Sequence, residues 1–209
     1  VIVNTIPDVQ FSAAPTAGCR PLTVVFDNQS TPGNYLWSFG DGATSTSFSP
    51  THTYMQPGTY SVTLEVSSGS CSNTLTLPSL VQVYADPVAD FSMTPTVVDA
   101  ENGTVFFSDQ SLGATQWLWN FGEQASAVSS LQNPSYTFSV DGTHQVCLSV
   151  QNNFGCADSI CKFVIVQPFI SFYIPSAFSP NGDGINDIFA PYGINVSPDE
   201  FSMRIFDRW

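Results

Sequence analysis

Positive charge is the scarcest feature of this 209-residue chain, which has 4 Lys and Arg against 17 Asp and Glu and a formal net charge of −13. A chain this acidic is repelled by phosphate backbones and by anionic lipid surfaces, so we expect no nucleic-acid partner. Lys and Arg are good helix formers, whereas Thr, Ser, Val, Phe, Gly and Pro are abundant here. This composition favours strands and turns over helices.

Long apolar runs are also missing. No run reaches the ~18 residues that a membrane-spanning helix needs, and residues 1–4 contain no basic region followed by an apolar stretch. We therefore expect neither a transmembrane segment nor a signal peptide within this sequence. With 43% hydrophobic and 13% aromatic residues, the chain can still bury cores rather than remain disordered.

Catalytic motifs are absent as well. The sequence has no Gly-x-Ser-x-Gly, no His-Glu-x-x-His and no phosphate-binding glycine loop. Its two histidines, His52 and His144, have no Cys, His or Asp nearby at metal-binding spacing, so we expect them to pack in strands or turns. The carboxylates are scattered among turns, where a solvated surface is their usual place. We predict that the chain is not an enzyme.

What the sequence does contain is an internal repeat. The segment Trp37-Ser38-Phe39-Gly40-Asp41-Gly42 returns 82 residues later as Trp119-Asn120-Phe121-Gly122-Glu123, and the flanking segments recur in the same order. An apolar strand precedes each copy, at residues 1–3 and 81–83, and a third lies at residues 164–166. We therefore predict one domain at 7–85 and another at 86–168. Residues 1–6 would be the last strand of an earlier repeat or a linker, with more repeats upstream.

Hydrophobic alternation predicts the fold class. Tyr60, Val62, Leu64 and Val66 fall on one face of a strand, while polar residues fall on the other. The same parity turns three aromatic residues inward in each repeat: Tyr35, Trp37 and Phe39 in the first, and Trp117, Trp119 and Phe121 in the second. Short strands separated by turns in about 80 residues predict an all-β, two-sheet sandwich of the immunoglobulin class.

Two locations are possible for the side chains of Trp37 and Trp119: the surface or the core. Exposed tryptophans could stack on the sugars of a polysaccharide, which would suit a surface protein. Their parity with Phe39 and Phe121 instead favours the core between the sheets, where this fold class places a tryptophan.

These residues resemble the polycystic kidney disease (PKD) domain family, which is marked by a Trp-x-Phe-Gly-Asp-Gly turn followed by His-x-Tyr and Gly-x-Tyr-x-Val strands. The first repeat carries the whole pattern, including His52-Thr53-Tyr54 and Gly58-Thr59-Tyr60. The second repeat departs from it, because Glu123 replaces the turn Asp and Ser135-Tyr136-Thr137 stands where the His-bearing triplet is expected. The resemblance implies tandem immunoglobulin-like modules.

Residues 169–209 match neither repeat and resemble the opening of the gliding-motility-associated C-terminal domain, the type B sorting domain of the type IX secretion system. The resemblance implies a β-rich domain, incomplete here because the family continues beyond Trp209, that exports a folded passenger to the cell surface. Its partners would be the type IX translocon and outer-membrane β-barrel proteins. The matching motif residues are Pro175, Phe178, Pro180, Asn181, Gly182, Asp183, Gly184, Asn186 and Asp187.

The same segment offers a candidate calcium site. Asn181, Asp183 and Asp187, with the carbonyl of Ile185, place oxygens at alternating positions around a glycine-rich turn, and calcium takes six to eight oxygen ligands. The loop lacks the distal bidentate Glu of a full calcium loop. We favour a plain Asx/Gly turn, with calcium as the alternative and no other cofactor.

The five cysteines predict disulfides in an oxidising compartment. Cys19 and Cys71 could close the first repeat. Cys147 and Cys161 lie symmetrically about a hairpin in the second repeat, so we expect a cross-strand bridge between them. The position that corresponds to Cys19 has no cysteine in the second repeat, so we expect a free thiol at Cys156.

Two functions fit these features. The first is a repetitive, SprB-like surface adhesin of a gliding bacterium, exported by the type IX system and located at the cell surface. The second is the accessory stalk of a secreted hydrolase whose catalytic domain lies upstream. In either setting the repeats could also bind a polysaccharide or another surface ligand.

Overall fold

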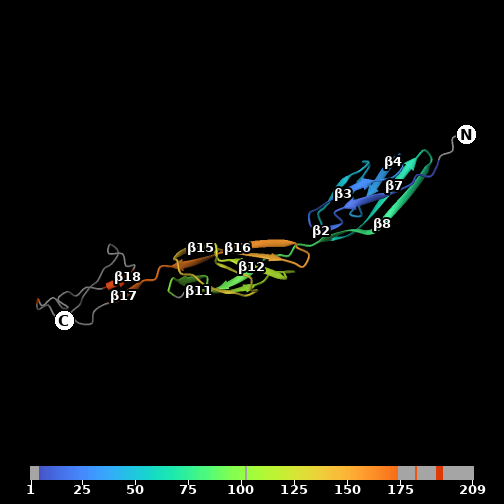
Figure 1. Cartoon of the computed structure of the whole chain (residues 1–209). Helices are drawn as coiled ribbons and strands as arrows, with labels where there is room; N and C mark the ends of the chain where they lie inside the picture. Colours follow the sequence, from blue (N-terminus) through green and yellow to red (C-terminus); the bar gives the residue numbers. More distant parts are fainter. Residues whose placement is uncertain (1–4, 102, 174–181, 183–191, 195–209) are drawn as a thin grey trace. The chain divides into compact units, whose positions relative to one another are not determined.

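The computed structural model describes residues 5–101, 103–173, 182 and 192–194, and every regular element among them is a β-strand (Figure 1). In that part of the chain no helix has the length and apolarity needed to cross a bilayer. The predicted all-β class is therefore confirmed. The strands of the first repeat are β1 (Phe11–Ala14), β2 (Ala17–Cys19), β3 (Leu22–Asn28), β4 (Asn34–Ser38), β5 (Thr44–Ser45), β6 (Thr51–Tyr54), β7 (Gly58–Ser68) and β8 (Cys71–Tyr84).

The second repeat has the same series of strands. They are β9 (Phe91–Thr94), β10 (Val97–Asp99), β11 (Thr104–Asp109), β12 (Gln116–Asn120), β13 (Val128–Ser129), β14 (Ser135–Thr137), β15 (Gly142–Gln151) and β16 (Ala157–Gln167). After the repeats, β17 (Ser171–Tyr173) pairs antiparallel with β18 (Tyr192–Ile194).

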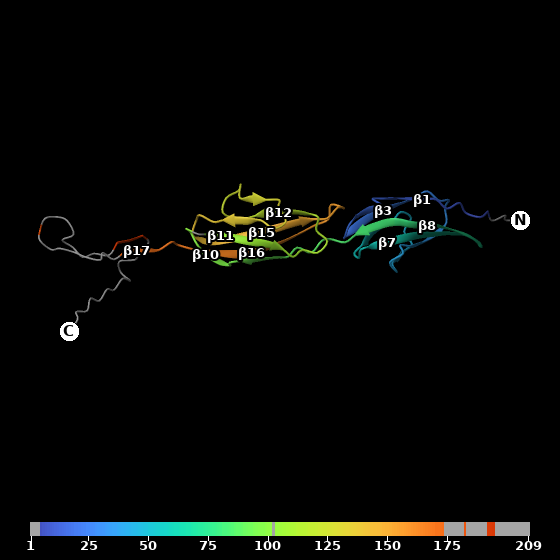
Figure 2. The ribbon, with the colours of Figure 1, turned by 90° about the horizontal axis from the view of Figure 1, so that it is seen from below.

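Each repeat is a sandwich of two sheets (Figures 1 and 2). In the first repeat β1, β3 and β6 form one sheet, in the order β1-β3-β6, and the other sheet has the order β2-β8-β7-β4-β5. The second repeat repeats both orders, with β14-β11-β9 as one sheet and β10-β16-β15-β12-β13 as the other. Most pairings are antiparallel, but β2 runs parallel to β8 and β10 runs parallel to β16.

The core of each sandwich follows the alternation of the sequence. In β7 the side chains of Val62, Leu64 and Val66 are fully buried, and the residues between them are partly exposed. Trp37 and Trp119 both have 0% exposure, so they are core residues rather than surface platforms. Side chains buried between two sheets in this way supply the main hydrophobic stabilisation of each repeat.

One glycine is required at the same place in both repeats. Gly40 has a φ of 85° and Gly122 a φ of 74°, the left-handed region that disfavours other residues. A Cβ atom at Gly40 would lie 2.5 Å from the carbonyl oxygen of Ser61, and one at Gly122 would lie 2.3 Å from that of Gln145. This close approach explains why the glycine is present in both repeats although the residue after it differs.

The structure divides into two compact units whose limits differ from those of the repeats. One unit runs to Asp90 and also contains Gln110–Trp117 and Ser149–Ile160. The other comprises Phe91–Asp109, Leu118–Leu148 and the chain from Cys161 onward. Two loops of the second repeat therefore belong to the same compact unit as the first repeat.

The residues predicted for calcium binding, Asn181, Asp183, Ile185 and Asp187, lie outside the described residues. The same holds for the residues of the predicted sorting motif, apart from Gly182. Gly182 has a φ of 76°, a conformation that glycine adopts readily in turns.

Candidate functional sites

An acidic side chain and an aromatic side chain meet beside the Trp-x-Phe-Gly turn of the first repeat. Asp41 accepts a hydrogen bond of 2.7 Å from Nε2 of His52 in β6, and a second of 3.0 Å from the backbone N–H of Ala43. The imidazole of His52 stacks on the ring of Phe39, with centroids 4.2 Å apart. Tyr54 completes the cluster, because its hydroxyl donates to the carbonyl of Phe39 at 3.0 Å. The arrangement fixes the turn against β6.

The second repeat builds the same arrangement from different residues. Glu123 accepts hydrogen bonds from the hydroxyl of Tyr136 and from the backbone N–H groups of Ser139 and Val140, each at 2.7 Å, and from Oγ of Ser139 at 3.0 Å. Tyr136 stacks on Phe121, with centroids 4.3 Å apart, just as His52 stacks on Phe39. The longer Glu side chain thus takes the place of Asp41, and a phenol takes the place of an imidazole.

This correspondence corrects our alignment of the second repeat. Placing Ser135-Tyr136-Thr137 against His52-Thr53-Tyr54 puts Ser135 opposite the histidine. The stacking instead matches Tyr136 with His52, and Phe138 with the buried Tyr54. The shift of one residue matters because neighbouring residues of a strand point to opposite faces. The departures of the second repeat from the family pattern therefore leave the turn geometry intact.

The charges at these turns are held by hydrogen bonds. Burial alone would raise the pKa of the Glu123 carboxyl, but the hydrogen bonds from Tyr136, Ser139 and Val140 outweigh burial and hold its pKa below the usual glutamate range. Burial and the bond to Glu123 raise the pKa of Tyr136 to about 12. For Asp41, burial is likewise outweighed by the bonds from His52 and Ala43, so its pKa is also lowered. Each carboxylate is a stable anion that anchors a turn.

We expect Glu123→Gln to destabilise the second unit at neutral pH by about 1–2 kcal/mol, since a charged acceptor of several hydrogen bonds is lost. A carboxyl whose pKa is lower in the folded state stabilises the fold above its unfolded-state pKa and loses that contribution as the pH falls through the folded value. The difference between wild type and variant should therefore shrink below about pH 4.5. Urea unfolding from pH 7 to pH 3 measures this difference.

Glu101→Gln is the matched control, because it removes an exposed carboxylate from the same repeat. If both variants lose the same stability at pH 7, the hydrogen bonds to Glu123 do not anchor the turn.

The two histidines take part in packing. His52 lies in β6 and His144 in β15, where Nε2 of His144 donates to the carbonyl of Val140 at 2.7 Å. The ring of His144 packs against Phe138 at 5.0 Å, as Tyr60 packs against Tyr54 in the first repeat. Neither histidine belongs to a group of three potential metal ligands in the described part of the chain.

Two disulfides are present, and one was predicted. Cys147 and Cys161 form the expected bridge between β15 and β16. The other bridge joins Cys19 to Cys156, so the predicted Cys19–Cys71 pair and the predicted free thiol at Cys156 are wrong. Cys71 keeps its thiol.

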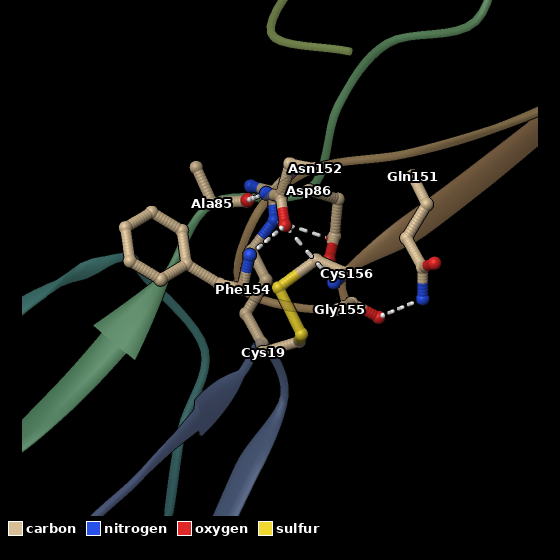
Figure 3. The surroundings of a disulfide bond; sticks show 9 residues. Cys19, Ala85, Asp86, Gln151, Asn152, Phe154, Gly155 and Cys156 are labelled. Atoms are coloured by element: carbon tan, nitrogen blue, oxygen red, sulfur yellow. Dashed lines mark hydrogen bonds and ion pairs between the residues drawn. A yellow bond between two sulfur atoms is a disulfide. The ribbon is translucent and has the colours of Figure 1, made fainter. Parts of the chain in front are cut away.

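The topology explains the correction. Cys19 ends β2 and pairs in register with Tyr84, the last residue of β8. Cys71 is the first residue of the same 14-residue strand. Extended strands rise about 3.3 Å per residue, so Cys71 lies roughly 40 Å from the end of β8 that Cys19 contacts. The loop between β15 and β16 instead brings Cys156 to Cys19 (Figure 3).

Hydrogen bonds surround this disulfide (Figure 3), and two aromatic rings stack near it. The side chain of Asn152 donates to the carbonyl of Ala85 at 2.9 Å and accepts from the backbone N–H groups of Phe154 and Cys156 at 2.9 and 3.0 Å. Phe154 stacks on Tyr84 with centroids 4.0 Å apart and planes within 7° of parallel. The disulfide is therefore accompanied by the hydrogen bonds of Asn152 and by the stacking of Phe154 on Tyr84.

The chemistry available around the disulfide is limited. Cys19, Asp86 and Cys156 have potential ligand atoms within 4.8 Å of one another, but the two sulfurs are bonded to each other and so offer no thiolate to a metal. The carboxylate of Asp86 pairs with Nε of Arg20 at 3.0 Å. A pocket of about 270 Å³ lies next to the disulfide; its lining includes Asp86, Thr115, Asn152 and Phe154.

Sequence reasoning missed Cys156 as a bridge residue and Asn152 as its support. A signal was present: Cys71 and Cys156 each come directly after the turn of the hairpin that joins the two longest strands of their repeat. The sequence prediction already treated the two cysteines as equivalent, but it considered a partner for Cys156 only within the second repeat, whereas the partner is Cys19 of the first.

Buried tryptophans between two sheets, hydrogen-bonded turns and two disulfides define tandem immunoglobulin-like β-sandwich modules. The PKD domain family model matches residues 4–81 and 84–166, and the chain belongs to this family. The disulfides and the PKD domains together indicate an extracellular or secreted protein.

Known proteins with related sequences include two collagenases. Collagenase ColQ1 of Bacillus cereus (strain Q1) is 28% identical over 125 residues, which cover 58% of this chain and 11% of the collagenase. Collagenase ColA of Bacillus cereus (strain ATCC 14579) is 61% identical over 33 residues, 16% of this chain and 3% of that protein. The chain thus spans only a small part of these relatives. Among solved structures, the PKD1 domain of Vibrio anguillarum Epp is similar with a TM-score of 0.35 and 22% identity, over 40% of this chain and 96% of that domain.

Proposed function

We propose that the chain belongs to a cell-surface adhesin exported by the type IX secretion system and used in gliding motility or surface adhesion. The tandem PKD domains would act as a non-catalytic spacer, and residues 169–209 as the secretion signal. The proposal depends mainly on the order of the parts: two sandwiches with buried tryptophans are followed by the segment Pro-Ser-Ala-Phe-Ser-Pro-Asn-Gly-Asp-Gly. A module without a reaction centre, joined to an export segment, suits a structural role.

The charge of the sandwiches supports this spacer role. Both cations among the described residues are engaged within the molecule: Arg20 pairs with Asp86, and Lys162 donates to the carbonyl of Phe91 and lies over its ring. The remaining charge on the two sandwiches is therefore predominantly negative. Like-charged surfaces repel one another, which keeps repeats soluble and apart from anionic surfaces.

A second candidate is the accessory region of a secreted hydrolase with a separate catalytic domain. The observation that favours it is the match to the two collagenases, of which this chain covers 11% and 3%. In this case the PKD domains would hold a catalytic domain near a polymer. An adhesin would contact a polysaccharide or another surface ligand directly.

The export proposal is tested by deleting residues 169–209 in a gliding bacterium that displays the protein. We expect surface labelling to be lost and the protein to accumulate inside the cell. Deleting residues 86–168 is the control, since it removes a longer stretch of chain but keeps residues 169–209, and it should leave display intact. Display that persists without residues 169–209 would refute the export role.

Binding assays separate the two candidates. We expect the purified 209-residue chain to bind spots on a polysaccharide array if the repeats are adhesive. Binding to collagen fibrils with no binding to the array would favour the accessory region of a hydrolase.

A further inference from the structure

The hairpins that carry Cys71 and Cys156 are equivalent in the two repeats. In the first, Ser68 pairs with Cys71 across the turn between β7 and β8. In the second, the backbone N–H of Asn152 donates to the carbonyl of Cys156 across the turn between β15 and β16, at 2.9 Å. Ser68 and Asn152 each follow the last buried valine of the incoming strand by two residues. The two cysteines therefore occupy the same structural position.

The contacts next to the two cysteines are also equivalent. Two residues after Cys71, the side chain of Asn73 donates to the carbonyl of Pro7 at 3.0 Å. Two residues after Cys156, the carboxylate of Asp158 accepts from the backbone N–H of Ala89 at 2.8 Å. In both repeats the hairpin thus holds the stretch of chain that enters the repeat. Whatever is joined to that stretch is brought close to the hairpin cysteine.

We propose that this hairpin cysteine is the attachment point for a disulfide from the preceding PKD module, and that Cys71 accepts such a bond from a cysteine at the end of a β2-type strand. The second repeat supplies the precedent, because Cys156 is bonded to Cys19 at the end of β2 (Figure 3). Cys71 is partly exposed and carries a thiol, so it is accessible for the same reaction. The partner is thus defined by its chemistry: a cysteine thiol in a second PKD module.

Forming the bond is a two-electron oxidation. The Cys71 thiolate attacks a mixed disulfide between glutathione and the partner cysteine, the new S–S bond forms, and glutathione leaves as a thiol. Overall, two protein thiols lose two electrons and two protons, and one glutathione disulfide becomes two glutathione thiols. An oxidised glutathione buffer therefore supplies the only co-reactant required.

A duplicated chain tests the proposal. Residues 7–86 are placed directly in front of Pro7, replacing residues 1–6, so that the new joint reproduces the natural joint between Asp86 and Pro87. After oxidation, peptide mapping should find a bond between Cys19 of the added copy and Cys71 of the original copy. Thiol titration in denaturant should then detect one thiol, that of Cys71 in the added copy.

One variant and one internal control make the result decisive. Cys71→Ser in the original copy should raise the thiol count of the duplicated chain from one to two, because Cys19 of the added copy loses its partner. The Cys147–Cys161 bridge serves as a folding control in every sample. Three thiols in the duplicated chain, or a bond between Cys19 and Cys71 within the added copy, would overturn the proposal.

Discussion

Trp119→Ala is expected to lower the free energy of unfolding of the second unit by about 3–5 kcal/mol, the range for truncating a large buried aromatic side chain. Trp119 has 0% exposure. Its ring lies edge-on to Phe91 at 5.0 Å and tilted to Phe107 at 5.4 Å, so its removal leaves a cavity among aromatic rings. The variant also leaves the carbonyl of Leu131 without the hydrogen bond that Trp119 Nε1 donates at 2.9 Å.

Leu118→Ala is the matched control, because Leu118 is the preceding residue of β12 and is 54% exposed. We expect it to change stability by less than about 0.5 kcal/mol, as exposed substitutions usually do. Urea unfolding followed by far-UV circular dichroism compares the two variants without depending on tryptophan fluorescence. Equal losses for Trp119→Ala and Leu118→Ala would contradict the inward orientation of the tryptophan, on which the sandwich assignment depends.

The difference between Trp119 and Leu118 shows why the fold could be read from the sequence. Alternation along a strand is a local property, since successive side chains point to opposite faces whatever the strand pairs with. The alternation of Trp119 and Phe121 therefore identifies the buried face of this part of the chain, whichever strands lie beside it. The recurrence of the pattern from Trp37 to Trp119 then fixes two sandwiches with equivalent strands.

The turn site could be predicted only in part. The pattern Trp-x-Phe-Gly identified the turn in both repeats, but the partner of Glu123 depends on which face of β14 meets the turn. Tyr136, rather than Ser135, faces Glu123, and a one-residue shift in a short strand reverses this outcome. Glu123 and Tyr136 in the second repeat replace Asp41 and His52 of the first. Because both partners differ, a comparison of residue types does not reveal that the two pairs are equivalent.

The pairing of the cysteines could not be predicted in the same way. Cys147 and Cys161 are 14 residues apart on two strands of one hairpin, so their contact follows from local alternation. Cys19 and Cys156 are 137 residues apart, and their contact depends on which loop packs beside the end of β2. Connectivity of this kind is not encoded in spacing, and assigning Cys19 to the nearer Cys71 ignored the length of β8.

Cleavage at the Asp86–Pro87 bond distinguishes the two pairings of Cys19 directly. This is the only Asp–Pro bond in the sequence, and mild acid hydrolyses such bonds selectively. With the Cys19–Cys156 bridge, fragments 1–86 and 87–209 remain linked until a reductant is added. With a Cys19–Cys71 bridge they separate without reduction. Acid also suppresses disulfide exchange, because the attacking thiolate is protonated, so the linkage reports the pairing present in the folded protein.

Replacing both bridge residues, Cys19→Ser with Cys156→Ser, should have a large effect on stability as well. In the chain-entropy account, a bond that closes a loop of 137 residues restricts the unfolded chain by up to about 5 kcal/mol, against about 3 kcal/mol for the 14-residue loop closed by Cys147 and Cys161. We therefore expect the double variant to unfold at a lower urea concentration than one lacking the shorter bridge. The contact around Asn152 and Phe154 would retain part of the stability, since it does not depend on the sulfurs. Two results together would show that Cys19 and Cys156 are not bonded in solution. The double variant would unfold at the wild-type midpoint, and the acid fragments of the wild-type chain would separate without a reductant.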